Sequence, residues 1–171
     1  GFEKQCWDHV CDRDYGSQFA SFAAYQNGYK VSVGDWRQFL AAIDRLREVK
    51  RMGIILLAHT KVSNFKNPEG FDYDRYVPDM SPETWSVTHG WADMVLFANY
   101  DTTAQKERGQ SKAKAKGGEN RFIYTSRRAA FDAKNRYELP DIISMGDSGK
   151  EAWANFQLAV TEARAQTQKE K

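Results

Sequence analysis

One short apolar run, Gly53-Ile-Ile-Leu-Leu-Ala-His59-Thr60, constrains the fold more than any other part of this sequence. It follows residues 35–50, where apolar side chains recur at helical spacing and charged side chains occupy the other positions. A short apolar run after an amphipathic helix predicts a buried strand in a parallel sheet that is covered on both faces. We therefore expect an α/β fold with a mostly parallel sheet flanked by helices.

The remaining elements follow from the same patterns. Besides the helix at 35–50, with Asp35 as its N-cap and Gly53 as its stop, we expect helices at residues 2–11, 83–91 and about 150–164. Further strands are predicted at residues 93–99, 121–126 and, as a short strand or turn, 135–139. The predicted irregular segments are a loop at 12–33, a long loop at 61–82, a flexible basic connector at 101–119 and a frayed end at 166–171.

Bulk properties narrow the class of protein. A length of 171 residues predicts one domain, and a net charge of +2 does not by itself indicate nucleic-acid binding. The longest apolar run is far shorter than a membrane span, and no signal peptide is present, so we expect a cytoplasmic protein with no membrane partner. Cys6, His9 and Cys11 lack a second ligand pair, so packing in a helix is favoured over zinc, and no metal site is predicted.

Polar side chains follow three of the predicted strands. His59 and Thr60 follow the first, Asn99 to Asp101 follow the second, and Arg127 and Arg128 follow the third. Ligands of open α/β sheets bind at the carboxyl ends of the strands. These residues are therefore the first candidates for a binding site.

The order of several motifs resembles one family. The motifs are Leu57-Ala-His59-Thr60-Lys61, Asp74-Arg75-Tyr76, Trp91-Ala-Asp93 through Ala98, Arg127-Arg128 and Ala133-Lys-Asn-Arg136-Tyr137. Together, over roughly residues 2–145, they resemble the phage-encoded, RecA-related nucleotide-binding proteins that are linked to single-strand annealing and recombination.

That resemblance implies a partial RecA-like P-loop NTPase core. Residues 1–146 would be its C-terminal portion, without the Walker A and Walker B segments, and residues 147–171 a C-terminal helix and frayed tail. The full-length protein would bind ATP and Mg²⁺ as an ATPase, whereas this chain alone is expected to be inactive. The segment from Ser144 to Glu151 is only partly similar to a phosphate loop, because Ser144 stands in place of glycine and Glu151 in place of Ser or Thr. We interpret it as a turn before the last helix.

Three residues are predicted to be catalytic through the resemblance. His59 ends a strand where relatives carry a sensor of the γ-phosphate. Lys134 and Arg136 are similar to the Lys-x-Arg motif of hexameric replicative helicases, which reaches the γ-phosphate held by the neighbouring subunit. Standing two apart on an extended segment, they would point the same way, although a solvated strand edge would look alike. Relatives often carry Gly where this chain has Glu138.

Nucleotide and DNA contacts are assigned to other residues. Thr60, Arg127 and Arg128 are the candidate nucleotide-binding residues. The predicted loop 61–82 takes the place of a DNA-binding loop in RecA-like proteins, and it combines cations with aromatic rings, a composition suited to single strands. Its candidate DNA-binding residues are Lys61, Phe65, Lys66, Arg75 and Tyr76. The alternative is a loop that packs at a subunit interface. The basic run 106–116 is a weaker candidate.

The predicted function is therefore a portion of an ATP-dependent DNA recombination or annealing protein. It would act as a homo-oligomer with ATP between subunits, and its partners would be single-stranded DNA and, as a further candidate, a single-stranded-DNA-binding protein. Two alternatives stay open: a non-catalytic module that binds single-stranded DNA or a protein partner, and a motor subunit resembling a hexameric helicase.

Overall fold

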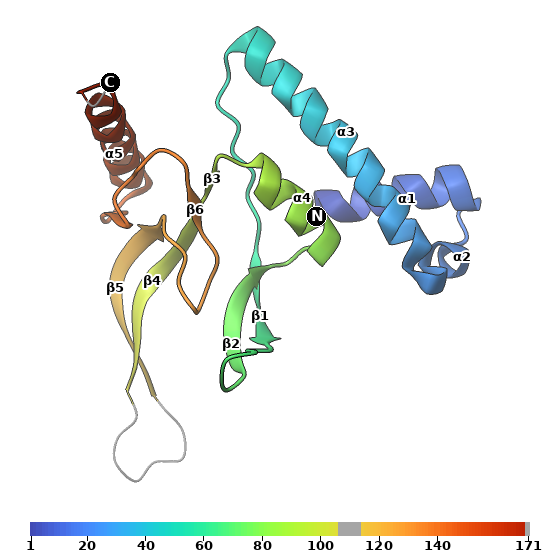
Figure 1. Cartoon of the computed structure of the whole chain (residues 1–171), viewed down its shortest axis with the longest axis horizontal. Helices are drawn as coiled ribbons and strands as arrows, with labels where there is room; N and C mark the ends of the chain where they lie inside the picture. Colours follow the sequence, from blue (N-terminus) through green and yellow to red (C-terminus); the bar gives the residue numbers. More distant parts are fainter. Residues whose placement is uncertain (106–113, 170–171) are drawn as a thin grey trace. The chain divides into compact units, whose positions relative to one another are not determined.

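A computed structural model describes residues 1–105 and 114–169 of the chain (Figure 1). Two compact units are present. Unit 1 consists of Gly1–Lys61 and Val77–Ala92, and unit 2 consists of Val62–Tyr76 and Asp93–Lys171. The boundaries fall within the strands β1 (Thr60–Phe65) and β2 (Tyr73–Pro78), which form a two-stranded sheet.

Unit 1 is helical. Its elements are α1 (Phe2–Tyr15), α2 (Phe19–Ala23), the 3-10 helix η1 (Ala24–Gln26), α3 (Asn27–Lys50) and α4 (Pro82–Trp91). Buried side chains of Val10, Cys11 and Phe22 form a core between α1 and α2, with Trp7 and Tyr29 packed against it. The predicted helices at 2–11, 35–50 and 83–91 are confirmed, and the first two are longer than expected.

The loop predicted at residues 12–33 is wrong. This stretch contains the end of α1, all of α2 and the first turns of α3, with a kink at Tyr25 and Gln26, whose φ angles are positive. Asp35 is not an N-cap, because it lies within α3 and accepts hydrogen bonds from Arg13 of α1. α3 ends at Lys50 and is capped by Arg51 in the left-handed conformation, before the expected stop at Gly53.

Side-chain hydrogen bonds join α4 to α3. The Trp36 indole donates to the Thr88 hydroxyl at 2.9 Å, and the Trp91 indole donates to the Asp44 carboxylate at 2.8 Å. α4 begins at Pro82 after an N-cap at Ser81, whose hydroxyl accepts from the backbone N–H of Thr84. These contacts fix α4 on the central helix of the unit.

The strand predicted at residues 53–59 is also wrong. These residues are irregular, and the side chains of Ile55 and Leu57 are 67% and 93% exposed. Among the described residues, no backbone hydrogen bond joins residues 54–58 to another segment. A segment forms a strand only when a neighbouring strand hydrogen-bonds to its backbone groups. None of the described strands pairs with residues 54–58. The apolar run is therefore left in contact with solvent.

Unit 2 contains the sheets and the last helix. Part of the predicted loop at 61–82 is wrong, because β1 and β2 occupy most of it. The other strands are β3 (Met94–Val95), β4 (Phe97–Gln105), β5 (Lys114–Tyr124), β6 (Lys134–Asn135) and β7 (Ile142–Ser144). Strands predicted at 93–99, 121–126 and 135–139 are thus confirmed in outline. The flexible connector predicted at 101–119 is wrong over its described residues, because 101–105 continue β4 and 114–119 belong to β5. Residues 106–113 of the predicted connector and basic run lie outside the described residues.

The expected parallel sheet is replaced by small antiparallel ones. β3 pairs with β6, and β5 lies between β4 and β7, all with antiparallel register (Figure 1). β4 and β5 follow one another along the chain, and consecutive strands can pair antiparallel without the crossover helix that parallel neighbours need. The α/β class is confirmed, but the parallel arrangement is not.

The last helix, α5 (Gly149–Lys169), covers β7 and confirms the helix predicted at about 150–164. Buried Leu139, Ile143, Ala159 and Ala163 form the core beneath it. Residues 166–169, expected to fray, continue the helix, whereas 170–171 lie outside the described residues. Among the described residues, no helix combines the length and the apolar character needed to cross a membrane.

Candidate functional site

The β1–β2 sheet presents a cation stacked on aromatic rings. The Arg75 guanidinium lies over the Phe65 ring, 5.3 Å from its centroid, and the Phe65 ring contacts Tyr73 at 5.2 Å. The Nε atom of Arg75 is buried and has no hydrogen-bond partner among the described residues. Stacking on a ring leaves the Nη donors of a guanidinium able to bind, and Arg75 has no ion-pair partner among the described residues, so Arg75 is suited to an anionic ligand.

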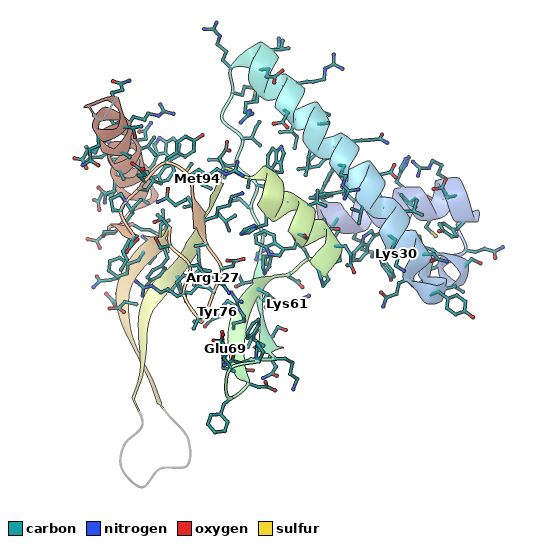
Figure 2. All side chains as sticks on the ribbon, viewed as in Figure 1. Lys30, Lys61, Glu69, Tyr76, Met94 and Arg127 are labelled. Atoms are coloured by element: carbon teal, nitrogen blue, oxygen red, sulfur yellow. The ribbon has the colours of Figure 1, made fainter. Side chains whose placement is uncertain are left out.

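Tyr76 links this sheet to the rest of unit 2. Its backbone N–H donates to the carbonyl of Ala130 at 2.7 Å, and it forms an isolated bridge with Phe131. The Tyr76 ring lies 5.2 Å from Phe97, which stacks on Phe131 at 4.3 Å. Phe97 and Phe131 are buried, whereas Tyr76, which is labelled in Figure 2, is 37% exposed. Tyr76 is thus anchored on one side and accessible on the other.

The two predicted nucleotide-binding arginines differ in their surroundings. Arg128 lies over the Tyr124 ring at 4.8 Å from its centroid, and its backbone exchanges hydrogen bonds with Phe131. Arg127 is exposed and has no ion-pair or hydrogen-bond partner among the described residues (Figure 2). We define the aromatic–cation cluster of unit 2 as the set Phe65, Arg75, Tyr76, Tyr124, Arg127, Arg128 and Phe131.

Carboxylates neutralise the two predicted DNA-binding lysines. In unit 1, Lys61 forms an ion pair with Asp79 at 3.1 Å. In unit 2, Lys66 forms an ion pair with Asp72. Both lysines are exposed, so a polyanion could compete for them only by displacing these partners.

His59 and Thr60 lie at the start of β1, in unit 1. Both are exposed, and the backbone carbonyl of His59 accepts a hydrogen bond from Asp79 at 2.8 Å. Among the described residues, neither side chain forms a hydrogen bond, and the predicted catalytic residues Lys134 and Arg136 belong to unit 2. Within the described part of its own unit, the structure therefore gives His59 no neighbour with a catalytic role.

Lys134 and Arg136 lie at β6, beside Asp93. The register of β3 and β6 pairs Val95 with Lys134, so its continuation sets Asp93 opposite Arg136. Arg136 donates to the Asp93 carboxylate at 3.1 Å, and the Tyr137 hydroxyl lies 3.4 Å from the other carboxylate oxygen. Burial, with a smaller contribution from Arg136, lowers the pKa of Lys134, and Asp93 opposes this shift. The Asp93 carboxylate thus contacts one cation and a phenol, and its charge also acts on Lys134.

A protein-family model described as AAA domain matches residues 1–137. The chain belongs to the AAA domain family. This family is of the P-loop NTPase type, so the ATP-binding class expected from the sequence is confirmed at that level. No curated protein and no solved structure matches the chain. The AAA domain match ends at Tyr137, immediately after Arg136, and α5 lies beyond it.

A turn directly after the AAA domain match holds Tyr137 in place. The Asn135 side-chain oxygen accepts from the backbone N–H groups of Tyr137 and Leu139, and its amide donates to the Leu139 carbonyl. Glu138 has a φ of 55°, in the left-handed region that favours glycine. The turn therefore favours glycine at position 138, which is the residue that the resembled proteins often carry there.

Sequence reasoning missed Asp93 and Asn135 as parts of this site. The sequence pattern places Asp93 only in a strand, and its pairing with Arg136 depends on the β3–β6 register. The available signal was that Asp93 precedes one short strand and Arg136 follows another. The pairing register of these strands, which brings the two together, could not be predicted from the sequence. Asn135, three residues before the left-handed turn position, was a second, weaker signal.

The segment before α5 is a turn, as expected. Gly146 has a φ of 59°, and the Glu151 carboxylate accepts from the backbone N–H of Asp147 at 2.9 Å. Glu151 thus occupies a donor that a phosphate would need. Among the described residues, no group of three His, Cys, Asp or Glu side chains could hold a metal ion, and Cys6 and Cys11 are free thiols.

Proposed function

We propose that this AAA domain chain is a portion of an ATP-binding protein that acts on single-stranded DNA in recombination or annealing, of the phage type that its sequence resembles. The aromatic–cation cluster of unit 2 carries the proposal. Its exposed Tyr76 ring offers a stacking surface of a kind that is sequence-tolerant, and its guanidinium groups match the phosphates between successive bases.

Within this cluster, Arg75, Arg127 and Tyr76 supply the contacts. Among the described residues, neither Arg127 nor Arg75 has an ion-pair partner, and Arg127 and Tyr76 are exposed. The ion pairs Lys61–Asp79 and Lys66–Asp72 reduce the net positive charge. We therefore expect binding that is modest and strongly salt-dependent rather than tight.

The nucleotide part of the proposal rests on family membership. Residues 1–171 contain no Gly-Lys-Ser/Thr motif, so we infer that a phosphate loop with its Mg²⁺-binding carboxylate comes from another segment or subunit. Lys134 and Arg136 would stabilise charge on the γ-phosphate of ATP bound to a neighbouring copy in an oligomer. His59 and Thr60 of unit 1 would respond to the γ-phosphate of bound ATP.

Fluorescence anisotropy with a labelled oligo-dT strand tests the DNA-binding claim. Arg127→Gln and Arg75→Gln should each weaken binding several-fold, and each should reduce the slope of log affinity against log salt by about one. Arg45→Gln is the matched control, because it removes the same charge from an exposed position on α3 in unit 1. Equal weakening by all three variants, or no binding by the wild-type chain, would contradict the proposal.

A further inference from the structure

Arg136 forms an ion pair with Asp93 at the end of the β3–β6 ladder. β3 and β6 pair over only two residues each, and the register places Asp93 opposite Arg136 at the end of this short ladder. Opposite charges facing one another across antiparallel strands attract. The Asp93 carboxylate receives Arg136 on one oxygen and faces the Tyr137 hydroxyl with the other.

This arrangement has a consequence for any anion that approaches Lys134 and Arg136. Arg136 is already engaged with a carboxylate, which has the same charge sign and hydrogen-bonding geometry as a phosphoryl oxygen. The side chains of Arg136 and Asp93 are 54% and 35% exposed, so their ion pair is solvent-screened and weak enough to exchange. A polyphosphate would therefore compete with Asp93 for the guanidinium.

We propose that Asp93 is a positioning residue that holds Arg136 in a resting position, and that a polyphosphate binds at Lys134 and Arg136 by taking the guanidinium from Asp93. The proposal rests on the proposed function, because it presupposes that Arg136 meets a phosphate. It adds Asp93 as a residue that sets how tightly Arg136 binds the phosphate. Asp93 lowers the affinity for the anion while it keeps the guanidinium aligned in its absence.

Tyr137 and Asn135 help to hold the Asp93 carboxylate in place beside Arg136. Asn135 fixes the turn backbone at Tyr137 and Leu139, and this turn brings the Tyr137 hydroxyl to Asp93. The carboxylate is thus held from two sides, by a cation and by a phenol. After Arg136 departs, the Tyr137 hydroxyl would remain as a donor for Asp93 and limit the cost of leaving the carboxylate alone.

Isothermal titration of the full chain with inorganic tripolyphosphate tests the proposal. Asp93→Asn should tighten binding up to about fivefold, the scale of an exposed ion pair. Asp93→Glu, which restores the carboxylate, should return affinity toward the wild-type value. The control Asp14→Asn removes the same charge from the Arg13–Asp14 pair of unit 1, where Arg13 stays paired with Asp35, and should leave affinity nearly unchanged.

Separate outcomes overturn separate claims. If Arg136→Gln weakens tripolyphosphate binding but Asp93→Asn does not change it, the phosphate-binding role of Arg136 is supported and the proposed role of Asp93 is wrong. If Arg136→Gln has no effect, the phosphate role of Arg136 in the proposed function fails. If Asp14→Asn tightens binding as much as Asp93→Asn, the effect is general electrostatics, and the positioning role is again wrong.

A second readout follows the Lys134 ammonium by NMR titration. The carboxylate of Asp93 raises the Lys134 pKa and Arg136 lowers it. Asp93→Asn should therefore lower this pKa, whereas Arg136→Gln should raise it. A Lys134 pKa that does not move in folded Asp93→Asn protein would show that Asp93 does not act on this pair of cations.

Discussion

Gly28 of α3 packs directly against the ring of Phe22, so closely that a Cβ atom at position 28 would overlap the ring carbons. Phe22 cannot move aside, because it is fully buried and its ring also contacts Tyr15 and Tyr29. The glycine therefore serves close approach between α2 and α3, even though glycine within a helix normally lowers stability.

Gly28→Ala should lower the free energy of unfolding by about 1–3 kcal/mol, as overpacking of a filled core does. Gly34→Ala is the matched control, because Gly34 lies in the same helix and a Cβ atom added there would meet nothing within 4 Å. It should leave stability unchanged or raise it by up to about 1 kcal/mol. Urea unfolding followed by circular dichroism measures both, and equal effects would refute the close-packing explanation.

The stability of unit 1 should depend on pH through Arg13. Its guanidinium donates hydrogen bonds to Asp14 and Asp35, and these bonds lower the pKa of both carboxyls below the usual 3.8. A depressed carboxyl pKa stabilises the fold above the unfolded pKa, and this contribution is lost as pH falls through the folded pKa.

Arg13→Gln should therefore be less stable than wild type at neutral pH, and the two proteins should converge as pH falls below the folded pKa values of Asp14 and Asp35. Denaturant titrations from pH 7 down to about pH 2.5 give the comparison. A stability difference that is constant across this range would mean that the ion pairs do not contribute through the ionisation of Asp14 and Asp35.

The turn at Glu138 should prefer glycine. With a φ of 55°, Glu138 adopts a conformation that costs an L-residue about 1–2 kcal/mol. Glu138→Gly removes this cost but adds about 0.4–1 kcal/mol of unfolded-state entropy, so stability should be retained or slightly raised. The β-branched variant Glu138→Val should lower it. Thermal melts that rank Val above Gly would contradict the backbone geometry of this turn.

Much of the fold could be predicted where local chemistry decides it. The Ser81-Pro82 cap and the amphipathic pattern specify α4 and α3, and apolar residues indicate the start of β4 and the end of β5. The polar remainder of both strands was predicted as a connector, because their pairing depends on each other. Prediction failed where long-range partners decide. The sequence around Gly28 predicts a loop, because its packing against Phe22 depends on a contact between two helices. Residues 53–59 have the pattern of a buried strand, but no described strand pairs with them. Asp93 could not be assigned to the site because it depends on strand register.

Exposed apolar side chains at residues 55–58 should make the isolated chain self-associate, because an unpaired apolar segment readily pairs with another strand. Leu57→Lys should reduce the apparent mass in light scattering at high concentration. Leu158→Lys is the control, since Leu158 of α5 is also well exposed, at 57%. A wild-type chain that stays monomeric, or equal effects of the two variants, would show that this segment does not drive association.

The central claim is that Arg136 acts on ATP bound to a neighbouring subunit. It is tested in the complete protein by mixing two variants that are each nearly inactive. One carries Arg136→Ala with an intact phosphate loop, and the other carries a mutated phosphate-loop lysine, outside residues 1–171, with Arg136 intact. Loss of an arginine that a neighbouring subunit supplies to the γ-phosphate lowers ATP turnover by a factor of about 10³–10⁵.

ATP turnover of the mixture is the decisive measurement, after subunit exchange has been demonstrated with labelled protein. With equal amounts mixed at random in a head-to-tail ring, about a quarter of the interfaces join an intact phosphate loop to an intact Arg136. The account predicts that turnover recovers toward this fraction of the wild-type rate. Turnover that stays at the level of the separate variants would show that Arg136 does not act across the subunit interface.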